Sequence, residues 1–334
     1  MLELTDADAS SIRDEVFAAY EPVVLRGLVN DWPAVQAARA SPTQLARYLA
    51  GFDNGSAVDA ILMPPEARGQ ISYNDAMDGF NFVRNRLPVS RILEQLARYA
   101  QFDDPPAVAV QSALLDDCLP GFAAENRLAV LDPAIAPRIW IGNRVTVPAH
   151  FDESMNVACV VAGRRRFTLF PPEQVANLYV GPLDFAPTGA AMSMVRFVAP
   201  DFAKFPRFGQ ALAAARISEL GPGDAIFIPT LWWHHVESLD SQLNVLVNYW
   251  WNGALGSVDR TASGMDCLIH ALLNIRPMPD ELRQAWAGLF DHYVFGANER
   301  DVDHIPEHRR GVLATPSPEA ARRIRDLLIA RLRR

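Results

Sequence analysis

The chain has 334 residues, of which 50% are hydrophobic and 21% are charged, as in an ordinary globular protein. This length suits one large domain with additions, or two modest domains. The formal net charge of −8 and the pI near 5.4 argue against a general nucleic-acid binder. Such a protein needs a basic surface that releases counterions from phosphates.

The cysteines and the first residues indicate a compartment. Cys118, Cys159 and Cys267 lie far apart in no CxxC spacing, which favours reduced thiols over a disulfide framework. The acidic start MLELTDADASSIRDE has no apolar signal core, and no run approaches the roughly 18 apolar residues of a membrane span. We therefore expect a soluble, cytoplasmic protein.

Residues 1–105 predict a framing segment of helices with a buried strand. Residues 5–20 read as a short capped helix, and the run Val23–Leu25 as a strand. Helices are expected again at 41–49, after a Ser-Pro entry, and at 90–100, where apolar residues recur at helical spacing.

The sequence pattern changes from helical to β-type at about residue 106. Short β-type runs punctuated by Gly, Pro and Asn continue to about residue 253, as in RIWIGNRVTVPAHFD and GPGDAIFIP. Several short strands separated by turn signals predict an antiparallel barrel or jelly roll, not alternating strands and helices. Residues 254–334 return to helical patterns and form an expected C-terminal helical extension.

A candidate metal site lies in the β region. VTVPAHFDES places His150 and Asp152 two residues apart, so on a strand both side chains project from one face. A histidine pair, His234 and His235, follows in GPGDAIFIPTLWWHHVES after a second β run. Two imidazoles and one carboxylate occupy three positions of a metal and leave three open, as suits Fe(II), a bidentate 2-oxo acid and dioxygen.

Other interpretations of these residues remain open. A lone HxD is more often a hydrogen-bonded structural histidine than a ligand, and only its combination with the second histidine motif favours a metal. The residues alone do not distinguish His234 from His235. A zinc or manganese isomerase or hydrolase is the alternative metal enzyme, although such sites usually offer more histidines.

The segments AHFDESMNVACVVAGRRRFTLFPPEQ, PDFAKFPRF, GPGDAIFIPTLWWHHVES and VNYWWNG together resemble the JmjC-type, cupin-like 2-oxoglutarate oxygenases. The resemblance runs from about residue 20 to about residue 253 and is closest to the branch that contains the asparaginyl hydroxylase factor-inhibiting HIF. It implies a mainly β fold, a double-stranded β-helix (cupin-like jelly roll) at 106–253 with flanking helices.

The resemblance also implies a ligand set. His150, Asp152 and His235 match the metal-binding positions, because the family pattern is taken to use the second histidine of the pair. His234 and Trp250 are then expected to lie next to the metal ligands without binding the metal themselves.

The co-substrate pocket shows both matches to the family and departures from it. Asn156 and Asn248 match polar positions that line the pocket in this branch, and Thr146 is a further candidate beside a position where the family carries threonine and this chain has Val147. Arg165 stands where the family often has a lysine for the distal carboxylate of 2-oxoglutarate. A guanidinium can still clamp a carboxylate through two hydrogen bonds.

The resemblance implies an Fe(II)- and 2-oxoglutarate-dependent dioxygenase that hydroxylates a side chain of a protein or peptide. The same chemistry on a small molecule or modified nucleoside, and a cupin-fold binding or sensory module without 2-oxoglutarate turnover, are the alternatives. The apolar faces of 265–295 and 317–332 predict a homodimer, since such an extension pairs subunits in the resembling branch.

Overall fold

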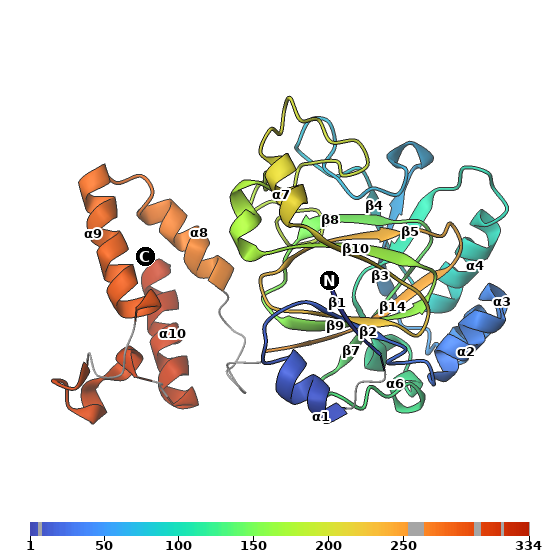
Figure 1. Cartoon of the computed structure of the whole chain (residues 1–334), viewed down its shortest axis with the longest axis horizontal. Helices are drawn as coiled ribbons and strands as arrows, with labels where there is room; N and C mark the ends of the chain where they lie inside the picture. Colours follow the sequence, from blue (N-terminus) through green and yellow to red (C-terminus); the bar gives the residue numbers. More distant parts are fainter. Residues whose placement is uncertain (6–8, 253–263, 297–301, 315–316, 334) are drawn as a thin grey trace. The chain divides into compact units, whose positions relative to one another are not determined.

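A computed structural model describes the chain except for residues 6–8, 253–263, 297–301, 315–316 and 334 (Figure 1). The chain divides into two compact units, Met1–Ala254 and Leu255–Arg334.

The first unit contains all fourteen strands of the described chain. They are β1 (Leu2–Thr5), β2 (Val23–Arg26), β3 (Val58–Met63), β4 (Val83–Leu87), β5 (Ala107–Val110), β6 (Ala113–Leu114), β7 (Pro137–Gly142), β8 (Thr146–His150), β9 (Met155–Ala162), β10 (Arg165–Phe170), β11 (Arg216–Leu220), β12 (Ala225–Ile228), β13 (Trp233–Ser238) and β14 (Asn244–Trp251).

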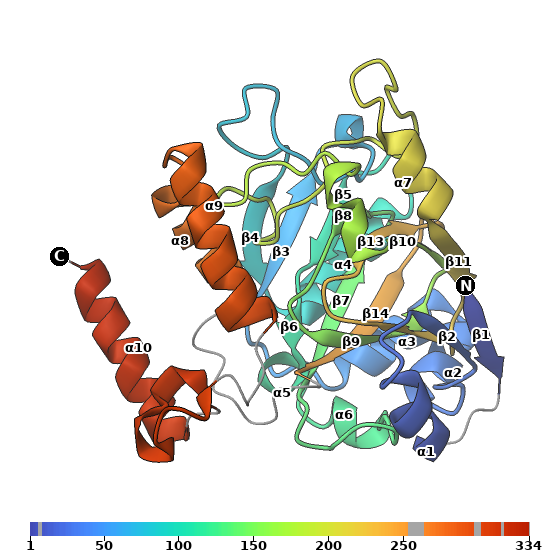
Figure 2. The same ribbon diagram turned by 60° about the vertical axis from the view of Figure 1, so that its left-hand side comes forward.

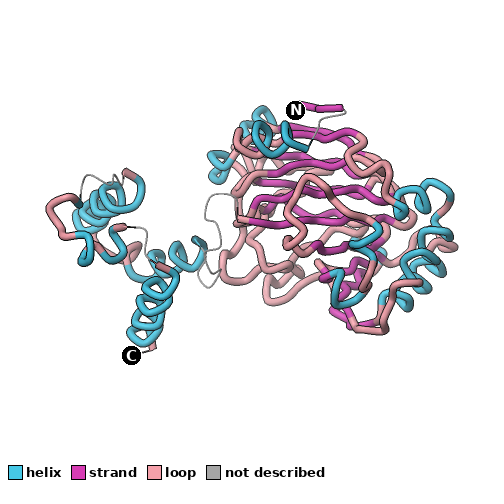
Figure 3. Tube along the Cα trace, turned by 90° about the horizontal axis from the view of Figure 1, so that it is seen from below, coloured by secondary structure: helices cyan, strands magenta, loops and turns pink. Residues whose placement is uncertain are grey.

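The described residues of the same unit form seven α-helices. They are α1 (Ala9–Ser11), α2 (Pro33–Ala40), α3 (Pro42–Ala50), α4 (Val89–Tyr99), α5 (Leu115–Cys118), α6 (Phe122–Glu125) and α7 (Phe208–Ala214). In Figure 3 the strands form the centre of this unit and the helices lie at its margins.

The strands form two sheets of unequal size. The large sheet has the order β1-β2-β12-β9-β14-β7-β5-β3-β4, with β6 also paired to β7, and the small sheet has the order β11-β10-β13-β8. All neighbours are antiparallel except β1 and β2. The chain passes repeatedly from one sheet to the other, as in β9 to β10 and β11 to β12, which is the connectivity of a jelly roll.

Strand β9 shows how the two faces of the large sheet are filled. All eight of its residues are buried, so it reads as a continuous apolar run. Val157, Cys159 and Val161 project into the core on the outer face of the large sheet. Ala158 and Val160 project to the other face, where they pack with Phe167 and Leu169 of the small sheet. The two sheets therefore share one inner core.

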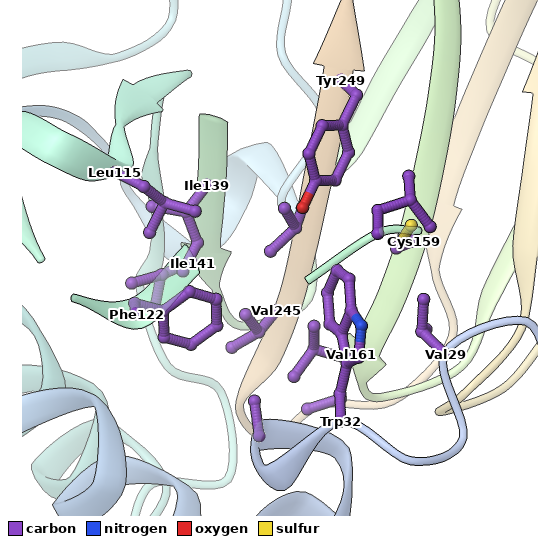
Figure 4. Packing of buried hydrophobic residues seen from close by; sticks show 14 of the residues in the cluster. Val29, Trp32, Leu115, Phe122, Ile139, Ile141, Cys159, Val161, Val245 and Tyr249 are labelled. Atoms are coloured by element: carbon purple, nitrogen blue, oxygen red, sulfur yellow. The ribbon is translucent and has the colours of Figure 1, made fainter. Parts of the chain in front are cut away.

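Helices α2, α3 and α4 cover the outer face of the large sheet, where Figure 1 shows them together. Leu45 and Leu49 of α3 are one helical turn apart and both are fully buried in this core. Ser41 caps α3 by accepting a hydrogen bond from the backbone N–H of Gln44 at 3.1 Å. Figure 4 shows Trp32, which precedes α2, packed near Val161 in the same cluster.

One arginine links the edges of the two sheets. Arg26, at the end of β2, forms ion pairs with Glu3 and Asp224, each at 2.8 Å. The same guanidinium donates to the backbone carbonyl of Glu219, on the small-sheet strand β11, at 2.9 Å. Hydrogen bonds to charged groups are among the stronger ones, so this cluster ties β1 and β2 of the large sheet to the edge strand β11 of the small sheet.

The described part of the second unit contains helices α8 (Gly264–Asn274), α9 (Asp280–Phe290) and α10 (Pro318–Leu332), with a π-helix at Asp291–Phe295 and 3-10 helices at Glu307–Arg309 and Gly311–Leu313. No residue of α8 or α9 is buried. None of the helices in the described part of the chain is long and apolar enough to cross a membrane. The prediction of a mainly β, cupin-type core with flanking helices is confirmed.

Candidate metal centre

The site begins with two neighbouring strands of the small sheet. β8 and β13 run antiparallel, and their register places His150 directly opposite His234. Side chains of such cross-strand pairs lie on the same face of a sheet and within contact distance. The two imidazole rings have their centroids 4.3 Å apart.

Asp152 completes the cluster from just beyond the end of β8. Its Oδ2 atom lies 3.7 Å from Nε2 of His234. The structure brings together one ligand atom from each of His150, Asp152 and His234, and these three atoms lie within 4.8 Å of one another. Two imidazoles and one carboxylate at this spacing fit a single metal ion.

Backbone carbonyls orient both histidines of the cluster. Nδ1 of His150 lies 2.9 Å from the carbonyl of Pro148, and Nδ1 of His234 lies 3.1 Å from that of Trp232. A carbonyl only accepts, so each Nδ1 carries the proton and each Nε2 presents a lone pair. Burial, reinforced by the nearby His150, lowers the pKa of His234, which keeps this imidazole in its neutral, metal-binding form.

The structure corrects the choice between the two adjacent histidines. His234 lies with His150 and Asp152, and His235, which was expected in this position, lies outside the cluster. The His235 side chain is only 1% exposed and stacks on Phe197, with ring centroids 4.0 Å apart. Burial lowers the pKa of His235 to about 3, so its imidazole is neutral at neutral pH. The side chain packs on the other face of the small sheet.

The alternation of side chains along β13 distinguishes the two histidines. Glu237 of β13 carries a partly exposed carboxylate that approaches Arg166 to 3.7 Å, outside the barrel. His235 precedes Glu237 by two residues and therefore shares its face, whereas His234 shares the inner face with the apolar Val236. The alternation therefore assigns His234 to the metal face, one residue before the histidine that the family pattern predicts.

The cluster opens into a cavity of about 190 Å³ between the two sheets. Its lining residues come from both sheets and from two connecting segments: Gln111, Ser112, Trp140, Val147, His150, Asp152, Asn156, Ala158, Arg165, Phe167, Thr188, Ala190, Ile228, His234, Val236, Leu246, Asn248 and Trp250. A larger depression of about 530 Å³ lies around Arg144 and Asp240, and none of its lining residues is a histidine. Of these two cavities, the smaller one therefore contains the candidate metal ligands.

Arg165 supplies a positive charge inside the cavity. The residue is 8% exposed, and its Nε atom has no hydrogen-bond partner among the described residues. None of the ion pairs formed by the described residues includes Arg165. Burial lowers its pKa to about 10, so the guanidinium stays charged at neutral pH.

A glycine turn fixes the position of Arg165. Gly163 has φ +74°, and a Cβ there would lie 2.0 Å from Oδ1 of Asn244, so the turn between β9 and β10 requires glycine. Arg165 and Phe167 then share the inner face of β10, and both line the cavity. Arg164 and Arg166 project outward, where they pair with Asp240 and Glu219.

Arg165 and the metal cluster lie at opposite ends of the cavity. Along the paired strands β10 and β13, Arg165 is opposite Ser238 and Leu169 is opposite His234. Four residues of strand correspond to about 13 Å. An extended arginine and a five-carbon dicarboxylic acid can together bridge this distance.

The other expected co-substrate residues divide into two groups. Asn156 and Asn248 both line the cavity, and Asn248 donates its amide to Oδ1 of Asn156 at 2.8 Å. Trp250, expected as a supporting residue, also lines the cavity. Thr146 does not: it is absent from the lining, where its neighbour Val147 takes the inward position on β8.

Four polar lining residues were not identified from the sequence. Trp140 lies on β7 between the buried Ile139 and Ile141, so alternation on that strand could have found it. Gln111, Ser112 and Thr188 lie outside regular strands, and no sequence period marks them. The buried Nε1 atoms of Trp140 and Trp250 and the hydroxyl of Thr188 have no partner among the described residues.

Comparisons with known proteins agree with this geometry. A family model described as "Cupin-like domain" matches residues 9–256, and the chain belongs to that family. Lysine-specific demethylase 8 of Xenopus tropicalis is 28% identical over 248 residues, which are 72% of this chain and 50% of that protein. HSPB1-associated protein 1 of Homo sapiens is 37% identical over 114 residues, or 34% of this chain and 22% of that protein.

A third relative, Lysine-specific demethylase JMJ31 of Arabidopsis thaliana, is 36% identical over 102 residues, or 30% of this chain and 18% of that protein. The chain thus spans half or less of the length of these relatives. The resemblance to JmjC-type, cupin-like oxygenases is confirmed, and the factor-inhibiting-HIF branch stays a prediction.

The cupin-like JmjC family uses Fe(II) and 2-oxoglutarate, and the residues present fit both. His150, Asp152 and His234 supply the nitrogen and oxygen donors of a facial Fe(II) site. The unpartnered, buried guanidinium of Arg165 fits a carboxylate at the far end of the same cavity.

The adjacent histidines provide a matched pair for testing the ligand set. We expect His234→Ala to weaken Co(II) binding by at least about 100-fold, because loss of a direct ligand costs more than loss of a residue that only orients one. We expect His235→Leu to bind Co(II) as the wild type does, because neither ring nitrogen of His235 has a hydrogen-bond partner among the described residues. Isothermal titration of both variants with Co(II), and their circular dichroism spectra, check this. A His235→Leu protein that folds but loses the metal, beside a His234→Ala protein that keeps it, would reverse the assignment.

Proposed function

We propose that this protein is an Fe(II)- and 2-oxoglutarate-dependent dioxygenase. The observation that carries the proposal is the pairing, within one cavity, of the His150, Asp152 and His234 cluster with the buried guanidinium of Arg165. A buried charge is costly unless an opposite charge and hydrogen bonds compensate for it. A ligand that carries one carboxylate toward Arg165 and metal-binding oxygens toward the cluster would satisfy both ends.

Each part of the cavity then has a role. His150, Asp152 and His234 would hold Fe(II), with the Nδ1 hydrogen bonds of both histidines keeping each Nε2 aimed at the ion. When bound, Fe(II) and 2-oxoglutarate would activate dioxygen, which is the oxidant: one oxygen atom would enter succinate as 2-oxoglutarate loses CO₂, and the other would be available to the target side chain.

The remaining residues position ligands and exclude water. Arg165 would clamp the distal carboxylate of 2-oxoglutarate, and the Asn156–Asn248 pair offers further polar contacts in the same cavity. Ile228, Val236 and Leu246 form an apolar part of the wall. Such a wall keeps water from the reacting centre and strengthens the electrostatic contacts within it.

Anaerobic titration tests the co-substrate site. Addition of 2-oxoglutarate to the Fe(II)-loaded protein should produce the weak visible charge-transfer band of a chelated 2-oxo acid. We expect Arg165→Met to raise the concentration of 2-oxoglutarate that half-develops this band about 100-fold, because two charge-assisted hydrogen bonds are lost. Arg166→Met is the matched control, since Arg166 neighbours Arg165 on β10 but projects outward.

Two outcomes of that titration would count against the proposal. Absence of the band in the wild type, with no succinate formed in air, would reduce the protein to a binding or sensory module. A band that Arg165→Met and Arg166→Met perturb equally would place the carboxylate partner elsewhere in the chain.

We further propose hydroxylation of an uncharged side chain on a protein or peptide. Apart from the metal cluster and Arg165, the polar lining residues are neutral: Gln111, Ser112, Trp140, Asn156, Thr188, Asn248 and Trp250. A methylated lysine would bring a second cation into a cavity that already holds a guanidinium, and no lining carboxylate other than Asp152 is there to pair with it. Neutral hydrogen-bonding groups instead suit an amide or aliphatic target.

Mass spectrometry of the products distinguishes the two reactions. We expect the Fe(II)-loaded protein, given 2-oxoglutarate, air and a library of synthetic peptides, to add the mass of one oxygen atom to peptides without releasing formaldehyde. The His234→Ala variant serves as the inactive control. Formaldehyde released from methyl-lysine peptides, with no oxygenated product retained, would establish demethylation instead.

We also propose that the helical unit pairs two copies of the chain. Its apolar side chains are widely exposed, including Leu273 at 71%, Phe295 at 78% and Leu332 at 64%. The first turn of α9 is acidic, with Asp280 and Glu281, whereas α10 carries four arginines, Arg322, Arg323, Arg325 and Arg331. A second copy offers both an apolar face and the complementary charges.

Sedimentation velocity over a range of concentrations tests this pairing. We expect a dimer at micromolar concentration and a shift to monomer in Leu282→Glu, because a buried carboxylate without a partner opposes association. Phe102→Glu, on an equally exposed apolar residue of the first unit, should leave the dimer intact. A wild-type protein that sediments as a monomer throughout would contradict the proposal.

A further inference from the structure

A loop between β10 and α7 contributes to the wall of the metal cavity. Thr188 and Ala190 belong to the segment 182–191 and both line the cavity. The segment lies between two short runs, 178–181 and 192–195, that pair like the arms of a hairpin. Gly181 donates its N–H to the carbonyl of Met192 at 2.9 Å, and Met194 donates to that of Tyr179 at 3.0 Å. The loop is thus the tip of a hairpin whose arms are hydrogen-bonded.

The base of this hairpin is anchored to the metal-bearing strand. The N–H of Ser193 donates to the carbonyl of Ala149 at 2.8 Å, one residue before His150. The hydroxyl of Ser193 donates to the carbonyl of Leu178 at 2.6 Å, and both side chains are buried. The arms are therefore fixed, and any movement of this segment is confined to its tip.

The tip is held down by two hydrogen bonds from a different part of the chain. The hydroxyl of Tyr73 donates to the carbonyl of Phe185 at 2.7 Å, and the guanidinium of Arg84 donates to that of Pro187 at 2.8 Å. Tyr73 lies in the connection from β3 to β4, and Arg84 lies in β4 itself. Figure 2 shows the long loop between these strands at the end of the unit where β5 and β8 are labelled.

Aromatic side chains reinforce these two bonds. The Phe80 ring stacks on Phe185, with centroids 4.9 Å apart, and on Phe82, with centroids 5.4 Å apart. The guanidinium of Arg84 lies over the Phe82 ring at 5.6 Å from its centroid. The phenylalanines are only partly buried, so separating them exposes less new apolar surface than opening a core contact would. We name the group Tyr73, Phe80, Phe82, Arg84 and Phe185 the aromatic clasp.

The closed cavity is small for the proposed reaction. Its 190 Å³ lies below the roughly 300–1,000 Å³ of pockets that enclose an organic ligand. The proposed reaction needs 2-oxoglutarate and the target side chain in the cavity at the same time. Most of the wall consists of paired strands, which cannot move without losing their ladder hydrogen bonds. Gln111 and Ser112 are tied to neighbouring strands, because Gln111 donates its N–H to the carbonyl of Asp59 at 2.9 Å and Arg138 donates to the carbonyl of Ser112 at 2.8 Å. The segment 182–191 is instead held mainly through side chains.

We propose that the segment 182–191 is a gate for the metal cavity and that the aromatic clasp holds it closed. The inference rests on the proposed function for its biological use. The gate itself is tested with metal alone. Tyr73 and Arg84 are positioning residues in this scheme, because they act through the backbone of the loop and touch neither metal nor co-substrate. Release of the clasp would move Thr188 and Ala190 away from the cavity and admit the primary substrate.

The test measures how fast EDTA removes Co(II) from the loaded protein. Tyr73→Phe keeps the ring but removes one hydrogen bond from the closed state, and we expect the removal rate to rise about fivefold. Arg84→Met, which removes the second bond, should act in the same direction, and the double variant should be faster than either. The equilibrium affinity for Co(II) and the thermal midpoint of unfolding should change little, since the ligands and the core are untouched.

Arg86→Met is the matched control. Arg86 lies two residues along β4 and also donates to a backbone carbonyl, that of Ala57 at 3.2 Å, with no bond to the gate. Removal rates for Tyr73→Phe and Arg84→Met that equal those of the wild type, or a rate for Arg86→Met that rises as much as theirs, would overturn the gate.

The two proposals fail in distinguishable ways. If no 2-oxoglutarate band forms but Co(II) removal is accelerated in Tyr73→Phe and Arg84→Met, the gate stands and the co-substrate assignment is wrong. If the band forms normally and the removal rates do not change, the dioxygenase assignment stands and the wall is rigid.

Discussion

The antiparallel pairing of β8 with β13 is the constraint on which the site depends. It sets His150 opposite His234 and brings Asp152, just beyond β8, to within 3.7 Å of the second imidazole. The pairing also turns His235 outward, against Phe197. A slip of one residue in this register would reverse both histidines, because side chains alternate across a strand. The register is fixed in turn by the shared core of the two sheets, where Val236 of β13 packs with Phe167 of β10.

A second consequence of the same architecture is a cation enclosed between the sheets. The glycine turn before β10 directs Arg165 inward while its neighbours Arg164 and Arg166 form ion pairs outside. Enclosing a guanidinium opposes folding unless an anion compensates for it, so this residue is better explained by ligand binding than by stability. Replacing the lysine common in the family with arginine keeps the charge and adds a planar pair of donors for a carboxylate.

The cavity is completed by segments that do not belong to the barrel. Gln111, Ser112 and Thr188 reach it from connections, and the aromatic clasp fixes one of these connections from the β3–β4 connection and from β4, at one edge of the large sheet. In the proposed function, strands and their ends hold the metal ligands and the co-substrate residues, and a loop forms the wall that would face the primary substrate. This division is common in enzymes, because a scaffold must hold catalytic groups still while substrates enter and leave.

The sequence by itself determined the fold class and the HxD motif, since both are written in local patterns: alternating apolar runs and a two-residue spacing. It placed Arg165 in the cavity through the family resemblance. It also placed Asn156 and Asn248 in the pocket through the family resemblance. Only the tertiary structure decided between His234 and His235, removed Thr146 from the lining and added Trp140 and Thr188. These depend on the register between strands and on the packing of a distant loop, which are set by contacts far apart in the chain that no short motif contains.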